Sequence, residues 1–299
     1  MGGRIEIVEV SPRDGIQNEA TVLSARTRLA LIARLADAGL RRIEVASFVN
    51  PQRVPQMADA ETVIAGLPAT VRGIGLALNV RGVERALATA IAEINFGLAA
   101  TDGFATRNQG RPVADMLEAW GEAARLCHAA GRPLTAVLST AFGCPYDGEV
   151  AVGRVADIVA EIAAAAPASI ALADTIGAAV PSDVRARVAA ARAAAPGIPI
   201  TCHFHNTRNT GLANAVAAVE AGVTTLDASA GGFGGCPFAP AATGNIPTED
   251  LAYMLQRMGY ETGVDIDALI ATAHWLGEQL GHPPPGMVAR AGPFPRRAA

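Results

Sequence analysis

Two histidines stand one residue apart in the segment "ITCHFHNT", residues 200–207. The segment has the composition of a buried strand, and in a strand residues i and i+2 lie on the same face. His203 and His205 would therefore point to one side, while Cys202 and Phe204 point to the other and pack beneath helices. A single inward histidine is most often structural, but two imidazoles on one face at a strand end favour a metal site.

Three further side chains could complete such a site. Asp14, in "SPRDGIQNE" (residues 11–19), offers a carboxylate oxygen, although an aspartate of a turn would also fit. Arg13 offers a fixed cation for an enolate or carboxylate oxygen, or forms a surface ion pair. Asn245 could give its amide oxygen to the metal, or cap a helix that begins near Pro247.

A glycine-rich segment, "GGFGGCPFAPAATGN" at residues 231–245, precedes that expected helix. Its length and glycine content suit a mobile lid over an active site. The segment carries one thiol, Cys236. A buried and inert thiol is the commoner state of a cysteine, but a position in such a loop favours a chemical role.

The chain contains no lysine, and all 24 of its basic residues are arginine. A Schiff base with a carbonyl substrate needs a lysine amine, so Schiff-base aldolase and pyridoxal-phosphate chemistry are excluded. If the protein acts on carbon–carbon bonds next to carbonyls, a metal ion is the expected electrophile.

The composition also limits which binding partners and which cellular compartment are expected for the protein. A net charge of −4 does not favour nucleic acid or an anionic membrane as a partner. No apolar run reaches the roughly 18 residues of a membrane-spanning helix. The N-terminus lacks a signal-peptide pattern and the four cysteines show no paired spacing, so we expect a cytoplasmic protein.

Short apolar runs alternate with amphipathic helical patterns along the chain, which predicts a (β/α)8 TIM barrel. A doubly wound open sheet is the alternative, but that fold does not require eight strands that are each followed by a helix. We expect a single domain over residues 1–299, with the barrel at about 4–260, an extra helix at about 265–281 and an irregular tail at 282–299. The eight strands are expected at residues 4–10, 41–48, 71–78, 92–99, 133–140, 169–175, 198–205 and 224–229.

In TIM barrels the reacting groups lie at the carboxyl ends of the strands. The polar clusters of this chain fall at those positions. Residues 11–19 follow the first expected strand, Glu44 lies in the second, Asp174 closes the sixth, the two histidines close the seventh, and residues 231–245 follow the eighth. Their convergence on one rim is stronger evidence for an active site than any single cluster.

The order of several motifs resembles that of the 3-hydroxy-3-methylglutaryl-CoA lyase family, within the DRE-TIM metallolyases. The resemblance covers roughly residues 5 to 281. The "RDG" and "HFH" pieces are shared with Claisen-type synthases and carboxyltransferases, whereas the glycine-rich loop is more specific to lyases. The motifs are "VEVSPRDGIQNE", "IEVASFVNPQRVPQM", "FGCPYDG", "ADTIG", "HFHNT" and "GGFGGCPFAPAATGNIPTEDLAYML".

This resemblance implies a divalent metal, Mg²⁺ or Mn²⁺, and a retro-Claisen cleavage of 3-hydroxy-3-methylglutaryl-CoA into acetyl-CoA and acetoacetate. Such lyases act in leucine degradation and ketone-body formation. The resemblance also implies a homo-oligomer, a dimer or tetramer. The implied metal ligands are Asp14, His203, His205 and Asn245.

The resemblance implies roles for further residues. Arg13 would stabilise the enolate of the departing acetyl-CoA, and Cys236 would take part in proton transfer. Glu44 and Asp174 would line the catalytic pocket. Gln17 is expected to contact the substrate.

The chain departs from the family pattern after the second histidine, where "NTRNTG" replaces a stretch typically read as D-T-Y-G-Q-A. Arg208 therefore stands in place of an aromatic residue. We expect it to meet the acyl-CoA substrate through an anionic group, with a surface ion pair as the alternative. Ala20 stands where many members carry lysine. These changes leave the acyl group open, so a citramalyl-CoA-like or longer branched 3-hydroxyacyl-CoA is an alternative substrate.

Other functions remain possible from the sequence. A Claisen-type synthase would share Arg13, Asp14 and the two histidines, but such enzymes usually carry a further region. A biotin-dependent carboxyltransferase would need a lysine, which this chain lacks. A non-catalytic barrel with a metal site is the remaining alternative.

Overall fold

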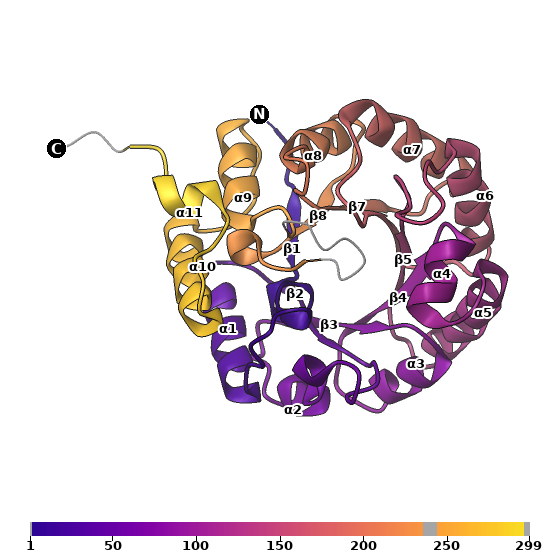
Figure 1. Ribbon diagram of the computed structural model, residues 1–299, viewed down its shortest axis with the longest axis horizontal. Helices are drawn as coiled ribbons and strands as arrows, with labels where there is room; N and C mark the ends of the chain where they lie inside the picture. The colour runs from indigo at the N-terminus through magenta and orange to yellow at the C-terminus, as the bar shows by residue number, and fades with distance from the viewer. Residues whose placement is uncertain (1, 236–243, 296–299) are drawn as a thin grey trace.

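The computed structural model describes residues 2–235 and 244–295. Eight parallel strands follow one another around a closed barrel, and helices surround it (Figure 1). Each strand lies within the segment expected for it, so the prediction of a (β/α)8 barrel is confirmed. The strands are β1 Glu6–Glu9, β2 Arg42–Ser47, β3 Arg72–Ala77, β4 Glu93–Ala99, β5 Leu134–Ser139, β6 Ser169–Asp174, β7 Ile200–Phe204 and β8 Thr225–Ala228.

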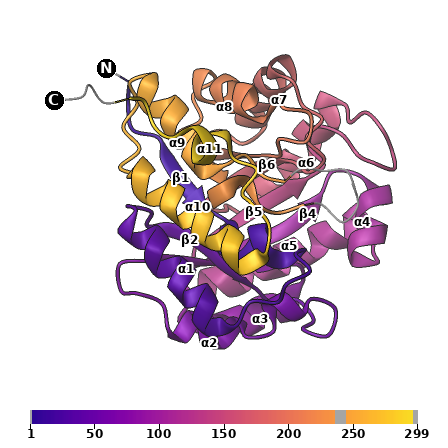
Figure 2. The ribbon, with the colours of Figure 1, turned by 60° about the vertical axis from the view of Figure 1, so that its left-hand side comes forward.

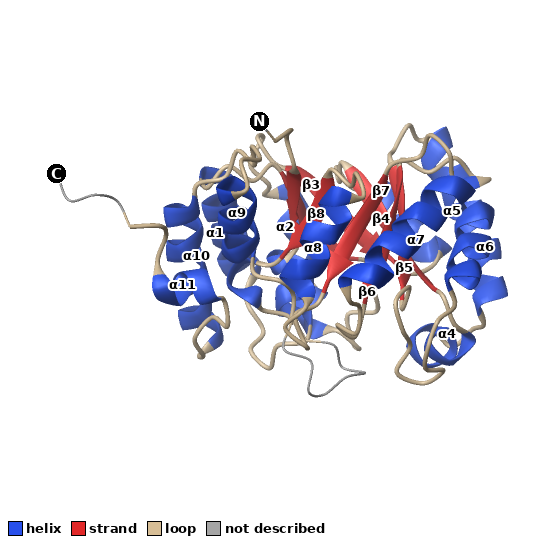
Figure 3. Ribbon diagram, turned by 90° about the horizontal axis from the view of Figure 1, so that it is seen from above, coloured by secondary structure: helices blue, strands red, loops and turns tan. Residues whose placement is uncertain are grey.

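Helices follow the strands and run along the outside of the barrel (Figure 3). Single turns at Ser11–Gly15 and Ala230–Gly232 follow β1 and β8, where the site residues were expected. The helices are α1 Ala25–Asp37, α2 Ala60–Ala65, α3 Val80–Leu87, α4 Asp102–Gln109, α5 Val113–Ala129, α6 Val152–Ala163, α7 Pro181–Ala194, α8 Gly211–Glu220, α9 Thr248–Arg257, α10 Ile266–Leu280 and α11 Met287–Ala291. Among the described residues, no helix is both long and apolar enough to cross a membrane.

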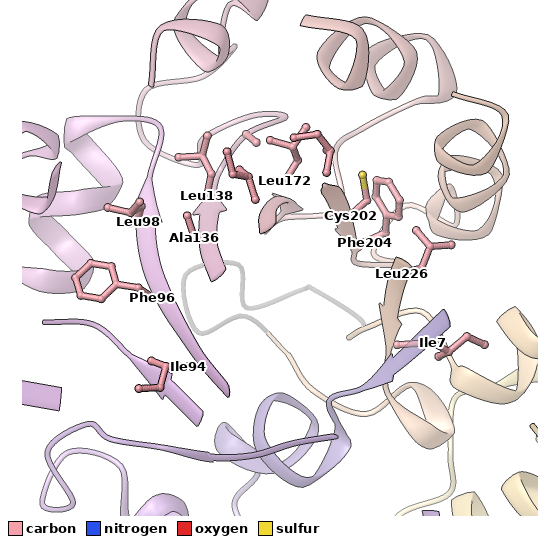
Figure 4. Packing of buried hydrophobic residues seen from close by; sticks show 14 of the residues in the cluster. Ile7, Ile94, Phe96, Leu98, Ala136, Leu138, Leu172, Cys202, Phe204 and Leu226 are labelled. Atoms are coloured by element: carbon pink, nitrogen blue, oxygen red, sulfur yellow. The ribbon is translucent and has the colours of Figure 1, made fainter. Parts of the chain in front are cut away.

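The main hydrophobic core lies between the outward faces of the strands and the helices (Figure 4). Cys202 and Phe204 point outward from β7 into this core and are almost fully buried, as the alternation of the strand predicts. A second, small apolar cluster of Val8, Val10 and Ile74 is separate from the main core.

The expected extra helix at about 265–281 is confirmed as α10, which packs against α1 and α9 (Figure 2). The prediction of an irregular tail over 282–299 is wrong in part, because α11 forms within it. The Asp250 carboxylate, on α9, accepts hydrogen bonds from the backbone N–H groups of Met287 at 2.9 Å and Val288 at 2.6 Å. This cap comes from a distant part of the chain, so local composition could not reveal it.

Candidate metal centre and active site

Asp14, His203 and His205 meet at the carboxyl end of the barrel. One potential ligand atom from each lies within 4.8 Å of the others. The two imidazole rings have centroids 4.9 Å apart. His203 belongs to β7, His205 follows its last residue, and Asp14 lies in the turn after β1. Barrel closure therefore brings together three of the four residues that the family resemblance implied as metal ligands.

Asp227, on β8, orients His203. The register of β7 and β8 pairs Cys202 with Leu226 and so places the two polar side chains beside each other. His203 Nδ1 is 2.6 Å from Asp227 Oδ1. Burial alone would lower the pKa of His203, but the carboxylates of Asp227 and Asp14 together outweigh burial and raise it to about 9. Because Nδ1 faces Asp227, Nε2 is the nitrogen that can bind a cation.

Sequence analysis assigned no role to Asp227. A signal was present, because Asp227 is a charged residue in the middle of a strand, in "TTLDAS". The closed order of strands was needed to show that it adjoins the histidines.

Two buried polar atoms at this site have no hydrogen-bond partner among residues 2–235 and 244–295: His205 Nδ1 and Asn245 Oδ1. The Asn245 amide nitrogen donates to Asp14 Oδ2 at 2.9 Å and to the Phe233 carbonyl at 3.0 Å. Unpartnered buried polar atoms are costly, so a bound cation that takes them as ligands would satisfy them. A carboxylate, two imidazoles and an amide oxygen together fit a divalent metal ion.

Arg13 lies between two carboxylates. Its Nε donates to Glu44 Oε2 at 2.5 Å, its Nη2 also pairs with Glu44, and its Nη1 donates to Asp14 Oδ1 at 2.5 Å. Burial would raise the pKa of Asp14, but Arg13 and His205 outweigh burial, so the pKa lies well below its usual range. Asp14 is therefore an anion at neutral pH, as a metal ligand must be.

Asp174 and Arg208 both form hydrogen bonds with the backbone of the loop between β6 and α7. The Asp174 carboxylate is buried and accepts from the backbone N–H groups of Ala178 at 2.8 Å and Ala179 at 3.1 Å. Arg208 Nη1 donates to the carbonyls of Ile176 at 2.8 Å and Gly177 at 3.0 Å. Among the described contacts, Arg208 thus bonds to backbone carbonyls rather than to the surface acid considered above.

Gln17 lies three residues after Asp14, near the end of the segment 11–19. Its Oε1 is buried and has no hydrogen-bond partner among the residues that the structure describes. The contact of Gln17 with the substrate therefore stays a prediction.

Cys236 and most of the expected lid lie outside the described residues. The end of the glycine-rich segment is described, and it pairs with the end of β7. Asn206 N donates to Gly244 O at 2.9 Å, and Ile246 N donates to Phe204 O at 3.2 Å. This pairing sets Asn245 beside His205.

The fold and the site define a TIM barrel with a possible metal-binding triad at its carboxyl rim, and three comparisons place it among known proteins. The family model described as HMGL-like matches residues 4–276. An (R)-citramalyl-CoA lyase of Chloroflexus aurantiacus is 43% identical, with 97% of this chain and 95% of the relative covered. A hydroxymethylglutaryl-CoA lyase of Bacillus subtilis is 37% identical, with 94% of this chain and 95% of the relative covered.

Similar solved structures point to the same family as these relatives. The structure of an HMG-CoA lyase from Acinetobacter baumannii, in complex with coenzyme A and 3-methylmalate, matches with a TM-score of 0.93 at 36% identity, covering 99% of this chain and 97% of that one. The carboxyl transferase domain of Rhizobium etli pyruvate carboxylase, at 18% identity and a TM-score of 0.68, shares the fold. The chain belongs to the HMGL-like family, and it is a carbon–carbon lyase.

Proposed function

We propose that the protein cleaves 3-hydroxy-3-methylglutaryl-CoA to acetyl-CoA and acetoacetate in a divalent-metal-dependent retro-Claisen reaction. The observation that carries the proposal is the position of Arg13, which adjoins the possible metal triad and is fixed by two carboxylates. The hydroxymethylglutaryl-CoA lyases among its relatives support this substrate.

The residues that would hold the metal are Asp14, His203, His205 and Asn245. When bound, Mg²⁺ or Mn²⁺ would polarise the C3 hydroxyl of the substrate and lower its pKa. Asp227 would keep His203 turned toward the cation through the contact at Nδ1.

The reaction breaks the bond between C2 and C3. The hydroxyl proton leaves, C3 becomes a carbonyl, and the electron pair of the broken bond passes to C2 as the enolate of acetyl-CoA. Arg13 supplies a fixed cation for the thioester oxygen, on which the enolate charge develops. C2 then takes up a proton, and Cys236 is the proposed participant in that transfer.

Three further residues at the carboxyl rim of the barrel have proposed roles: Asp174, Arg208 and Gln17. Asp174 holds the loop between β6 and α7 through the backbone of Ala178 and Ala179. The nitrogens of Arg208 other than Nη1 are offered to an anionic group of the substrate. Gln17 Oε1 is offered to a donor of the substrate.

A second candidate substrate is citramalyl-CoA, favoured by the relative that is 43% identical. It shares the C3 hydroxyl and methyl groups with 3-hydroxy-3-methylglutaryl-CoA, and its carboxylate is closer to C3 by one methylene. One methylene in a pocket changes selectivity by about 10-fold to 200-fold. The same bond cleavage would then release pyruvate in place of acetoacetate.

A panel of 3-hydroxyacyl-CoA thioesters tests the proposal, with release of acetyl-CoA and of the partner ketoacid measured in Mg²⁺ or Mn²⁺. We expect the highest kcat/KM with 3-hydroxy-3-methylglutaryl-CoA and loss of activity on chelation of the metal. A higher kcat/KM with citramalyl-CoA would change the substrate but keep the reaction. No release of acetyl-CoA from any thioester would refute the lyase mechanism.

A further inference from the structure

Asn95, inside the barrel on β4, bonds to one of the carboxylates that fix Arg13. Its amide nitrogen donates to Glu44 Oε1 at 2.9 Å. Since β3 lies between β2 and β4 in the barrel, this bond links strands that are not neighbours. We infer that Asn95 is a positioning residue that holds Glu44 and, through Glu44, the guanidinium of Arg13. The inference rests on the proposed function only in assigning Arg13 a catalytic role.

Glu44 needs this partner because its side chain is only 2% exposed. Arg13 occupies Oε2, and Asn95 is the partner of Oε1. A buried carboxylate oxygen without a donor is strongly destabilised, so the Glu44 carboxylate would turn if Asn95 lost its amide. The two donors of Arg13 that face Glu44 would then lose their fixed acceptor.

The direction of Arg13 matters because a second carboxylate competes for it. Asp14 already accepts from Nη1 at 2.5 Å. A guanidinium released by Glu44 can turn further toward Asp14 and pair with both of its oxygens, since arginine and carboxylate form bidentate pairs. Asn95 holds Glu44 through a neutral donor. It therefore orients the Glu44 carboxylate without neutralising the negative charge that pairs with Arg13.

The test is Asn95→Leu, which keeps the branched shape of the side chain and removes its donor. Thr135→Val is the matched control. Thr135, on β5, lies in register with Asn95 of β4, and its hydroxyl bonds to Ser169 Oγ at 2.8 Å rather than to Glu44. We expect Asn95→Leu to lower kcat by about 10-fold to 100-fold, as for a slightly misplaced catalytic group, with KM changed by less than about threefold. Thr135→Val should keep the kcat of the wild type.

A double-mutant cycle separates positioning from general damage. If Asn95 acts through Arg13, Asn95→Leu should cause almost no further loss of kcat in an Arg13→Lys background. Losses that multiply in the double variant would overturn the inference, as would an unchanged kcat in Asn95→Leu. Should Asn95→Leu fail to fold, Asn95→Ala, which also removes the donor, is measured in the same way.

A crystal structure of Asn95→Leu gives a readout that needs no activity. We expect Glu44 to turn and Arg13 Nε to lose its contact with Oε2. Arg13 and Glu44 in unchanged positions would overturn the inference even if the wild type cleaves no thioester. A wild type without lyase activity, together with a displaced Arg13 in the variant, would count against the proposed function alone.

Discussion

Arg13 depends on the planar shape of its guanidinium. Three of its nitrogens reach two carboxylates in different directions, Glu44 through Nε and Nη2 and Asp14 through Nη1. An ammonium cannot reproduce that geometry. We expect Arg13→Lys to lower kcat at least ~10²-fold, as for removal of one oxyanion donor, while the affinity for Mn²⁺ stays near that of the wild type. Near-normal turnover would make Arg13 a structural residue.

Asp227→Asn addresses the orientation of His203. An amide oxygen still accepts from Nδ1, but it carries no charge, so the imidazole is a poorer and less well oriented ligand. We expect the affinity for Mn²⁺ to fall by about 10-fold to 100-fold in calorimetric titrations. Asp265→Asn is the control, because Asp265 caps α10 away from the site and asparagine also caps helices. Equal affinity in the two variants would remove Asp227 from the metal site.

Arg208 is exposed, and among the residues that the structure describes it bonds to backbone carbonyls through Nη1 alone. Its other nitrogens can still meet an anionic group of the substrate. A contact made in the ground state and in the transition state alike affects KM rather than kcat. We expect Arg208→Tyr to raise KM for the true substrate much more than it lowers kcat. An unchanged KM for every thioester would limit Arg208 to holding the loop between β6 and α7.

The site residues that follow from local sequence pattern could be predicted, and those that depend on contacts between strands could not. The alternation of a strand put His203 and His205 on one face, and the chain order put Asp14 at the same rim. Asp227 and Asn95 were missed because each acts through a residue on another strand. Their roles depend on barrel register, which a single sequence does not display.

At the scale of elements, the return of the glycine-rich segment along β7 fixes Asn245. Gly244 has φ of +85°, and a Cβ there would lie 2.4 Å from the Gly232 carbonyl oxygen. Only glycine fits this position without a shift of the backbone. The pairing of Gly244 with Asn206 therefore depends on the glycine as well as on the strand.

We expect Gly244→Ala to lower the free energy of unfolding by about 1–3 kcal/mol and to weaken Mn²⁺ binding, because Asn245 is displaced. Gly259→Ala is the matched control, since Gly259 has φ of +87° but open space around its Cβ position. The control should lose stability through backbone strain and keep the metal affinity. Equal metal affinity in both variants would show that the position of Asn245 does not depend on Gly244.

At the scale of the whole molecule, the fold was more predictable than its last segment. Eight short apolar runs separated by amphipathic helical patterns suffice to predict the barrel, because each helix buries its apolar face against the strands. α11 could not be predicted in this way, because Asp250 of α9 caps it across a long sequence separation. Long-range capping of this kind leaves no local signal.

Global stability should depend on Glu249, which is fully buried beneath the turn after β8 and accepts from Gly231 N at 2.9 Å. Burial raises the pKa of Glu249 to about 8, and the neighbouring Asp250 and Glu9 carboxyls add to the rise. Between pH about 4.5 and about 8 the folded protein keeps a proton that the unfolded chain releases. The free energy of unfolding therefore falls as pH rises through this window.

Glu249→Gln should remove that part of the pH dependence, which amounts to about 1 kcal/mol per pH unit for one such group. Urea unfolding at several pH values measures it as the difference in slope between the variant and the wild type. The exposed Glu278 supplies the control, and Glu278→Gln should keep the slope of the wild type. If Glu249→Gln and the wild type lose stability in parallel from pH 5 to pH 8, Glu249 is already ionised in the folded protein.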